Sequence, residues 1–213
     1  MKFKDRTEAG QILAVNLQKY KGSNSIILAI PRGGVPLGYT VSKELNLPLD
    51  LVLSKKIGHP MHKEYAIGAV TLKNSVLSDV ASQIPSNYIE EETQRIREKL
   101  KNKTLEYYGK NKPMSLKDKI LIIVDDGIAT GNTVLSTVQM LFEEAPKKIV
   151  VATPVASPSA IKKIQHSPYV DEVICIMAPE YFMAVGQFYE DFEPVDDYLV
   201  KALLQEAKLN STT

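Results

Sequence analysis

Residues 120–134, ILIIVDDGIATGNTV, place a run of apolar residues directly before two adjacent aspartates and a turn of small residues. An apolar strand suits a sheet that is covered on both faces, which is typical of a parallel sheet between layers of helices. Two neighbouring carboxylates, in contrast, repel each other and pack poorly. Asp125 and Asp126 therefore need a partner that lies outside the strand.

Similar apolar runs recur along the chain and alternate with stretches of helical periodicity. The apolar runs end at Ile30, Ser54, Val124, Val155 and Met177. Amphipathic helices are predicted for residues 5–20, 35–46, 86–112, 133–145 and 194–209, with the first and last packed near one another. This alternation predicts an α/β fold with a parallel β-sheet flanked by helices.

The composition is that of one medium-sized domain without a dominant charge. Of the 213 residues, 44% are hydrophobic, so we expect a single domain over residues 1–213 with a sizeable core. The 26 Lys and Arg residues nearly balance the 25 Asp and Glu residues, which argues against a protein that coats nucleic acid. The opening residues contain no apolar leader, and no segment reaches membrane-spanning length. We expect a cytoplasmic protein without a membrane partner.

A turn of small and hydroxylated residues follows the two aspartates and leads into a predicted helix. Its members are Gly127, Ala129, Thr130, Gly131, Asn132 and Thr133. Backbone N–H groups at a helix start, with threonine hydroxyls beside them, can bind a phosphate group. The carboxylates of Asp125 and Asp126 would repel that phosphate, but they can accept hydrogen bonds from hydroxyl groups. The segment therefore suits a ribose 5-phosphate, and we expect both carboxylates to face solvent at the end of the strand.

The same segment resembles the signature of the type I phosphoribosyltransferases. In that family two acidic residues follow an apolar strand and precede a Thr-Gly-containing loop, which binds the 5-phosphate of phosphoribosyl pyrophosphate. The resemblance covers about residues 26–177 and implies the fold of that family. It also implies that residues 125–133 bind this substrate.

A second turn supports the resemblance. In SIILAIPRGGVPLG, residues 25–38, a strand is followed by a tight turn and a helix. Gly33 and Gly34 permit close backbone approach, and Arg32 can bind phosphate oxygens with its guanidinium group. The turn resembles the pyrophosphate loop of the family. That resemblance implies a cis peptide bond between Pro31 and Arg32 in the liganded state.

Residues 54–70 correspond to the mobile loop that closes over the substrates in the family. Gly58 and Pro60 break regular structure there, so we expect a polar lid with few regular hydrogen bonds. Lys55 and Lys56 are candidates for contacts with pyrophosphate. His59 and His62, together with Glu64, have the residue types of a metal site, but Pro60 disturbs their register and their role stays open.

The segments outside the core are expected to select the acceptor. The family builds a small hood over its active site, which here would come from residues 1–20 and 178–197. Two interpretations of the aromatic side chains in the second segment stay open, stacking on a base or packing in the core. These side chains are Tyr181, Phe182, Phe188 and Tyr189. Ala129 stands where hypoxanthine-guanine enzymes carry an aspartate, so a 6-oxopurine acceptor is disfavoured and the nucleophile stays open.

The resemblance implies transfer of a phosphoribosyl group to a nitrogen nucleophile, with a nucleobase of purine or pyrimidine salvage as the expected acceptor, and release of pyrophosphate. Mg²⁺ is the implied cofactor, held by the substrate and by Asp125 and Asp126 through water or hydroxyl groups. The expected catalytic side chains are Arg32, Lys55, Lys56, Asp125 and Asp126. We further expect a homo-oligomer, a dimer. The alternative is a regulatory protein that senses phosphoribosyl pyrophosphate and binds nucleic acid, but the mixed charges of residues 86–112 favour a solvated helix.

Overall fold

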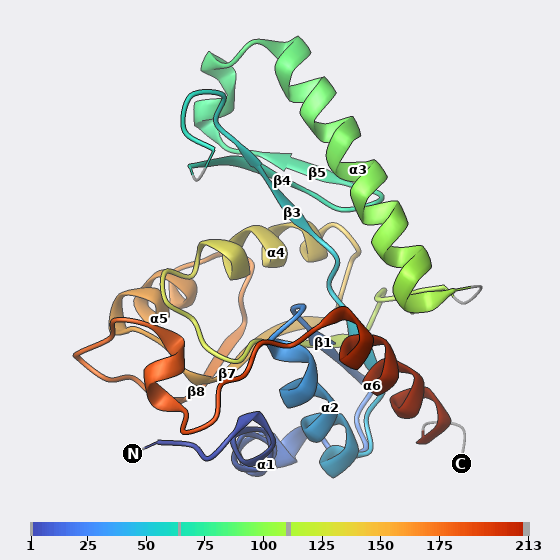
Figure 1. Ribbon diagram of the computed structural model, residues 1–213, viewed down its shortest axis with the longest axis vertical. Helices are drawn as coiled ribbons and strands as arrows, with labels where there is room; N and C mark the ends of the chain where they lie inside the picture. Colours follow the sequence, from blue (N-terminus) through green and yellow to red (C-terminus); the bar gives the residue numbers. More distant parts are fainter. Residues whose placement is uncertain (1, 64, 110–111, 211–213) are drawn as a thin grey trace.

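A five-stranded sheet forms the centre of the computed structural model, which describes residues 2–63, 65–109 and 112–210 (Figure 1). In spatial order its strands are β2 (Leu49–Leu51), β1 (Ser25–Ala29), β6 (Ile120–Val124), β7 (Lys148–Val155) and β8 (Glu172–Met177). Every neighbouring pair is parallel. The predicted α/β fold with a parallel sheet is confirmed, although β2 ends at Leu51 and not at Ser54.

Helices cover both faces of this sheet. They are α1 (Arg6–Asn16), α2 (Gly34–Leu45), α4 (Asn132–Phe142), α5 (Pro158–Gln165) and α6 (Asp197–Asn210). Alternate residues of each strand face opposite layers. Ile27 packs with α1, α2 and α6 in one hydrophobic cluster, whereas Ile26 packs with α4 and α5 in another. Burial on both faces explains why the strands are apolar throughout.

A second sheet stands beside the first and was not predicted. It consists of β3 (Lys55–Gly58), β4 (Ala66–Val70) and β5 (Ser75–Leu77), all antiparallel. A short 3₁₀ helix, η2 (Asp79–Gln83), leads from it to the long helix α3 (Ser86–Tyr108). We call the unit from β3 to α3 the arm. The arm has its own hydrophobic cluster, which includes Ile57, Ile67 and Leu100. Figure 1 shows the arm above α4.

The expected irregular lid is therefore wrong for residues 55–58, which form a strand. Ile57 is fully buried in the arm cluster, and this burial outweighs the breaking tendency of Gly58. His59 and His62 lie in the connection between β3 and β4, where the His59 N–H donates to the Tyr65 carbonyl at 2.8 Å. Glu64, the third residue of the weighed metal site, lies outside the described residues.

The end of α3 is anchored to the main sheet by a buried carboxylate. Asp50 of β2 is only 2% exposed, and it accepts a hydrogen bond from the Tyr108 hydroxyl. The Met114 N–H donates to its second carboxylate oxygen at 2.6 Å. A buried carboxylate must be hydrogen-bonded in this way to be tolerated. These hydrogen bonds thus attach the end of α3 to the main sheet.

The ends of the chain pack against the same helix. Both α1 and α6 contact α2, so the terminal segments do form helices as predicted. The segment before α1 pairs with residues 188–191, where the Phe3 N–H donates to the Phe188 carbonyl and the Glu190 N–H donates to the Phe3 carbonyl, each at 2.8 Å. A short 3₁₀ helix, η3 (Val185–Phe188), precedes this pairing.

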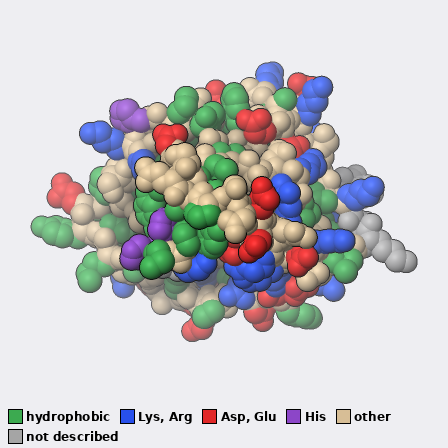
Figure 2. Space-filling view, turned by 90° about the horizontal axis from the view of Figure 1, so that it is seen from above, with side chains coloured by type: hydrophobic (Ala, Val, Ile, Leu, Met, Phe, Trp, Pro, Cys, Tyr) green, Lys and Arg blue, Asp and Glu red, His purple; other side chains and the backbone are tan. Residues whose placement is uncertain are grey.

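The surface of the arm carries charges of both signs. Figure 2 views the molecule from this side and shows Lys and Arg side chains interspersed with Asp and Glu side chains. Arg95 on α3, for example, forms an ion pair with Glu92 one turn before it. No helix in the described ranges is both long enough and apolar enough to span a bilayer.

Candidate functional site

The two motif turns meet at the carboxyl ends of β1 and β6. These strands are neighbours, and the strand order reverses between them, which is where open α/β sheets bind their ligands. A Cβ atom on Gly33 would lie 2.1 Å from Oδ2 of Asp126, so only glycine allows this approach. Gly34 begins α2. Two turns that lie about ninety residues apart in sequence thus form one surface.

The acidic pair is tightly hydrogen-bonded in the folded protein. The Asp126 N–H donates to Oδ1 of Asp125 at 3.0 Å, and the Tyr189 hydroxyl donates to the Asp126 carbonyl at 2.6 Å. Nε of Arg6 donates to Oδ2 of Asp126 at 2.9 Å, and the two side chains are only 11% and 12% exposed. The expectation that both carboxylates face solvent is therefore wrong for Asp126.

Burial makes this pair electrostatically costly. It raises the pKa of Asp125 well above its ordinary value, and the nearby charge of Asp126 raises that pKa further. Burial also raises the pKa of Asp126, although the hydrogen bond from Arg6 opposes this change. The site thus concentrates negative charge that a hydroxyl donor or a cation would stabilise.

Arg6 reaches the acidic pair because of how α1 begins. The Asp5 carboxylate caps this helix by accepting from the N–H groups of Thr7 and Glu8, each at 2.8 Å, so Arg6 is its first residue. The Arg6 guanidinium carbon lies 3.9 Å from the centroid of the Phe192 ring, and Nη1 donates to the Glu193 carbonyl at 2.9 Å. Arg6 thereby joins the acidic pair to the segment before α6. Its role was not predicted from the sequence.

The loop after the acidic pair has the predicted shape of a helix start. Gly131 has φ +74°, a left-handed conformation that favours glycine, and α4 begins at Asn132. The Ser157 hydroxyl fixes the loop by donating to the Ala129 carbonyl at 2.6 Å. Nζ of Lys163 donates to Oδ1 of Asn132, which brings a cation from α5 to the start of α4. This lysine too was not predicted.

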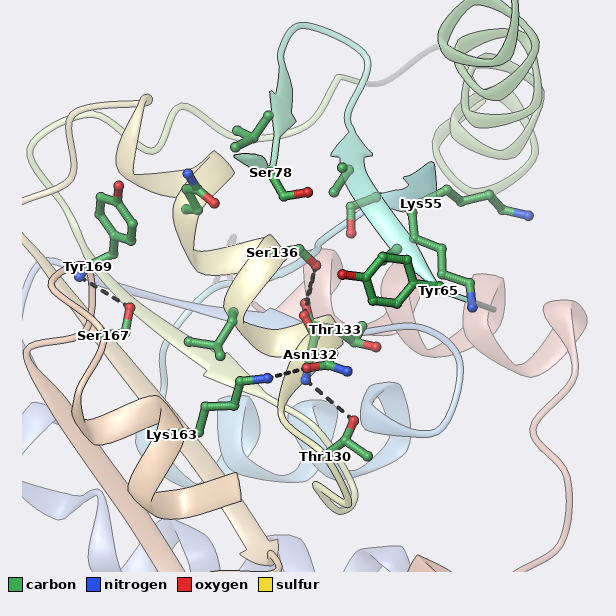
Figure 3. A pocket seen from close by; sticks show the side chains of 18 residues that line it. Lys55, Tyr65, Ser78, Thr130, Asn132, Thr133, Ser136, Lys163, Ser167 and Tyr169 are labelled. Atoms are coloured by element: carbon green, nitrogen blue, oxygen red, sulfur yellow. Dashed lines mark hydrogen bonds between the residues drawn. The ribbon is translucent and has the colours of Figure 1, made fainter. Parts of the chain in front are cut away.

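A large cavity of about 770 Å³ lies between this loop and the arm (Figure 3). Figure 3 shows Lys55, Tyr65 and Ser78 on the arm side, and Thr133, Ser136 and Lys163 on the opposite side. The other lining residues include Lys56, Thr130 and Asn132. Among the described residues that line it there are three lysines and no carboxylate. The cavity therefore favours an anion next to the loop.

A second cavity of about 380 Å³ adjoins the first at Ser54, Lys55 and Thr133. Arg32 lines it, and the peptide bond between Pro31 and Arg32 is cis, the geometry that the resemblance implies for the liganded state. Its remaining charged lining residues, within the described part of the chain, are Lys103 and Asp197. Among the predicted cationic residues, Arg32 and Lys55 therefore come together here, whereas Lys56 lines only the larger cavity.

The aromatic side chains of residues 181–189 divide between core and surface. Phe188 and Tyr189 are 8% and 3% exposed and belong to the main hydrophobic cluster. Phe182 packs on Phe188 with ring centroids 5.2 Å apart, whereas Tyr181 is 87% exposed. The core interpretation is confirmed for Phe188 and Tyr189. Gly127 lies under the same segment, since a Cβ atom there would meet Val185 at 2.3 Å.

Substituting Gly33 with alanine should damage the site more than the fold. The new methyl group would overlap the Asp126 carboxylate, and such overpacking costs about 1–3 kcal/mol. We expect the affinity for an anionic sugar phosphate to fall by about tenfold or more. Gly22→Ala is the control for a loss of stability alone, since φ +74° strains a side chain at Gly22 while no atom lies within 4 Å of such a methyl group. Calorimetric titration checks this, and equal affinities of both variants would contradict it.

The comparisons with known proteins agree on one family. The phosphoribosyl transferase domain family matches residues 7–192. Curated Mycobacterium tuberculosis proteins, named provisionally as phosphoribosyl transferases, are 33% identical over 211 residues. This match covers 96% of the chain but only 47% of those relatives, so the chain spans about half their length. A uracil phosphoribosyltransferase of Mycoplasma genitalium is 38% identical over 65 residues, which is 30% of the chain and 32% of that relative.

Solved structures share the fold of this chain. The crystal structure of TT1426 from Thermus thermophilus has a TM-score of 0.88 and 36% identity, and the match covers 97% of this chain and 99% of that one. A hypothetical protein of Neisseria gonorrhoeae has a TM-score of 0.51 and 13% identity over 97% of this chain and 98% of that one, which shows a shared fold alone. The match over residues 7–192, taken together with the fold, shows that the chain belongs to the phosphoribosyl transferase domain family and has the type I fold.

Proposed function

We propose that the chain transfers the phosphoribosyl group of phosphoribosyl pyrophosphate to a nitrogen atom of a small acceptor. The observation that carries this proposal is the meeting of three elements at one sheet edge. These are the glycine turn at Arg32 to Gly34, the acidic pair and the loop that opens α4. Each suits one part of the substrate: the pyrophosphate, the ribose hydroxyls and the 5-phosphate.

Each element has a distinct role in the proposed complex. The loop from Ala129 to Thr133 binds the 5-phosphate through its N–H groups, with Lys163 adding a positive charge beside it. Asp125 accepts hydrogen bonds from the ribose hydroxyls. Asp126 has one carboxylate oxygen bound to Arg6, so it contributes through its other oxygen and by holding the pair in place.

The reaction requires positioning and charge stabilisation more than covalent help. A new bond forms between the acceptor nitrogen and carbon 1 of the ribose, while the bond from carbon 1 to the pyrophosphate oxygen breaks. Pyrophosphate departs with the electron pair, and the acceptor nitrogen releases its proton to solvent. Arg32 and Lys55 stabilise the charge that develops on the leaving group, and the cavity walls hold the reacting groups together.

Mg²⁺ fits the donor set of this site. It prefers oxygen ligands and retains several water molecules, and Asp125 and Asp126 offer carboxylate oxygens, of which only one is bound to Arg6. The two carboxylates would hold the ion through water, and the bound ion would supply neutralisation of the pyrophosphate charge.

We propose a nucleobase as the acceptor, and its identity is the finer question. Ala129 in the phosphate loop disfavours a 6-oxopurine, and the local likeness to a uracil phosphoribosyltransferase makes uracil the first candidate to assay. The buried Phe188 and Tyr189 cannot stack on a base. Of the four hood aromatics, Tyr181 and Phe182 remain candidates for acceptor contacts, since Tyr181 is 87% exposed and Phe182 is only partly buried.

A pyrophosphate-release assay tests the proposal. The protein is incubated with phosphoribosyl pyrophosphate, Mg²⁺ and a panel of pyrimidines, purines and other nitrogen compounds. We expect release that requires both an acceptor and Mg²⁺ and that stops when a chelator is added. Binding of phosphoribosyl pyrophosphate without turnover on any acceptor would instead indicate a sensor, and absence of binding would reject both functions.

A further inference from the structure

The smaller cavity contains a charge arrangement that the sequence motifs do not explain. Lys103 comes from α3 of the arm, Arg32 comes from the turn after β1, and both approach Asp197 at the start of α6. These three elements are far apart in sequence. Their meeting at the predicted pyrophosphate turn suggests a shared ligand.

Asp197 is the centre of this arrangement. Its Oδ2 atom lies 2.7 Å from Nζ of Lys103 and 3.9 Å from Nη1 of Arg32. The Tyr107 hydroxyl donates to the other carboxylate oxygen. The hydrogen bond from Lys103 lowers the pKa of Asp197, so this carboxylate is ionised at neutral pH. It presents to Lys103 and Arg32 the same kind of oxygen that a phosphate group presents.

The cavity retains positive charge after this pairing. Among the described residues its lining contains the cations Arg32, Lys55 and Lys103 but only the one carboxylate. Lys103 and Arg32 are 36% and 52% exposed in their side chains, so their ion pairs with Asp197 are weak and easily exchanged. Pyrophosphate carries more charge and more acceptor oxygens than one carboxylate, and it would bind both cations more strongly.

We propose that Lys103 is a further pyrophosphate-binding residue, and that Asp197 holds Lys103 and Arg32 until pyrophosphate displaces it. This inference rests on the proposed function. It places part of the leaving-group site on the arm, whose Lys55 and Lys103 both line the cavity. The turn at Arg32 then supplies only part of the pyrophosphate contacts.

Calorimetric titration with two probes tests the role of Lys103. The probes are phosphoribosyl pyrophosphate with Mg²⁺ and inorganic pyrophosphate with Mg²⁺. Lys103→Met keeps the apolar stem but loses the charge, so affinity for both probes should fall by about tenfold or more. Lys103→Arg should keep affinity within about threefold, because the charge is retained.

Lys101→Met is the matched control. Lys101 is an exposed lysine on the same helix but does not line the cavity, so the loss of its charge should leave both affinities unchanged. Asp197→Asn removes the competing charge while the amide oxygen can still accept from Tyr107. It should raise both affinities by about twofold to fivefold.

The outcomes separate this inference from the function on which it rests. Wild-type protein that binds neither probe would reject both. Wild-type binding with equal affinity in Lys103→Met would overturn the role of Lys103 alone. Unchanged affinity in Asp197→Asn would overturn the displacement of Asp197 by pyrophosphate. Weaker affinity would overturn it too, because Asp197 would then contribute to substrate binding.

Discussion

Replacing Asp125 with asparagine should reduce turnover by about a hundredfold or more while making the folded protein more stable at neutral pH. The proposed ribose contact needs a carboxylate that only accepts hydrogen bonds, and an amide supplies a donor in its place. The amide oxygen can still accept from the Asp126 N–H, so the local hydrogen bond survives. Loss of activity would therefore not come from loss of the fold.

The direction of the stability change follows from the pKa of Asp125. Burial raises this pKa well above the ordinary value of 3.8, so the folded state binds more protons than the unfolded state in the interval between the two values. Stability is thus lost as the pH rises from 3.8 through the folded-state pKa. Asparagine removes this loss, because it does not ionise.

Urea unfolding at about pH 5 and about pH 8 measures this difference. The free energy of unfolding of the wild type should fall more between these two pH values than that of Asp125→Asn. Pyrophosphate release is measured on the same preparations. If Asp125→Asn turned over at the wild-type rate, the assignment of Asp125 to the ribose hydroxyls would be rejected. If both proteins showed the same pH dependence of stability, the claim that Asp125 carries a buried charge would be rejected.

Removing Arg6 should be the most destabilising single change in the site. Arg6→Ala leaves the buried Asp126 carboxylate without its ion-pair partner, which costs about 3–5 kcal/mol in comparable buried pairs. The loss should be smaller at about pH 5 than at about pH 8, because the unpaired carboxylate takes up a proton more readily at low pH. Binding of phosphoribosyl pyrophosphate should weaken with it, since Arg6 holds the acidic pair in place.

A double-mutant cycle separates the ion pair between Arg6 and Asp126 from the packing of the Arg6 side chain. Asp126→Asn combined with Arg6→Ala should cost less than the sum of the single changes, because no unpaired charge remains. Lys73→Ala is the control, since Lys73 forms an exposed pair with Glu144 and should cost less than about 1 kcal/mol. Additive effects of Arg6→Ala and Asp126→Asn in urea unfolding would contradict the proposed coupling.

The main sheet could be predicted because its strands are buried on both faces. Each strand then reads as an apolar run, as Ile120 to Val124 shows, and the motif turns follow at the strand ends. The arm could not be predicted in this way. Exposed and buried residues do not alternate along β3, since Lys55 and Lys56 are exposed and only the last two residues are buried. The sequence of this strand therefore resembles a polar loop.

The missed side chains depend on contacts across the chain. Arg6 and Asp126 are 120 residues apart, and no local spacing connects them. Lys103 belongs to a helix whose mixed charges indicate a solvated face. Arg95 on the same helix fits that interpretation, because it pairs with Glu92 on the surface. Lys103, in contrast, lies where α3 lines the smaller cavity. Which residues of α3 line the cavity depends on how this helix packs against the rest of the chain. The periodicity of the sequence alone does not determine that packing.

The position of the arm also has a consequence for the order of folding. Strands β1 and β6 are adjacent in the sheet, but the whole arm lies between them in the sequence, so their pairing must close a long loop. Loop closure costs entropy that rises with length, and distant pairings form slowly. The hairpins of β3, β4 and β5 close over a few residues, and the arm has a hydrophobic cluster of its own. If the arm folds first, it shortens the segment of chain that must close between β1 and β6. Local contacts within the arm, far from the acidic pair, therefore favour the pairing of β1 with β6 that forms the site of the acidic pair.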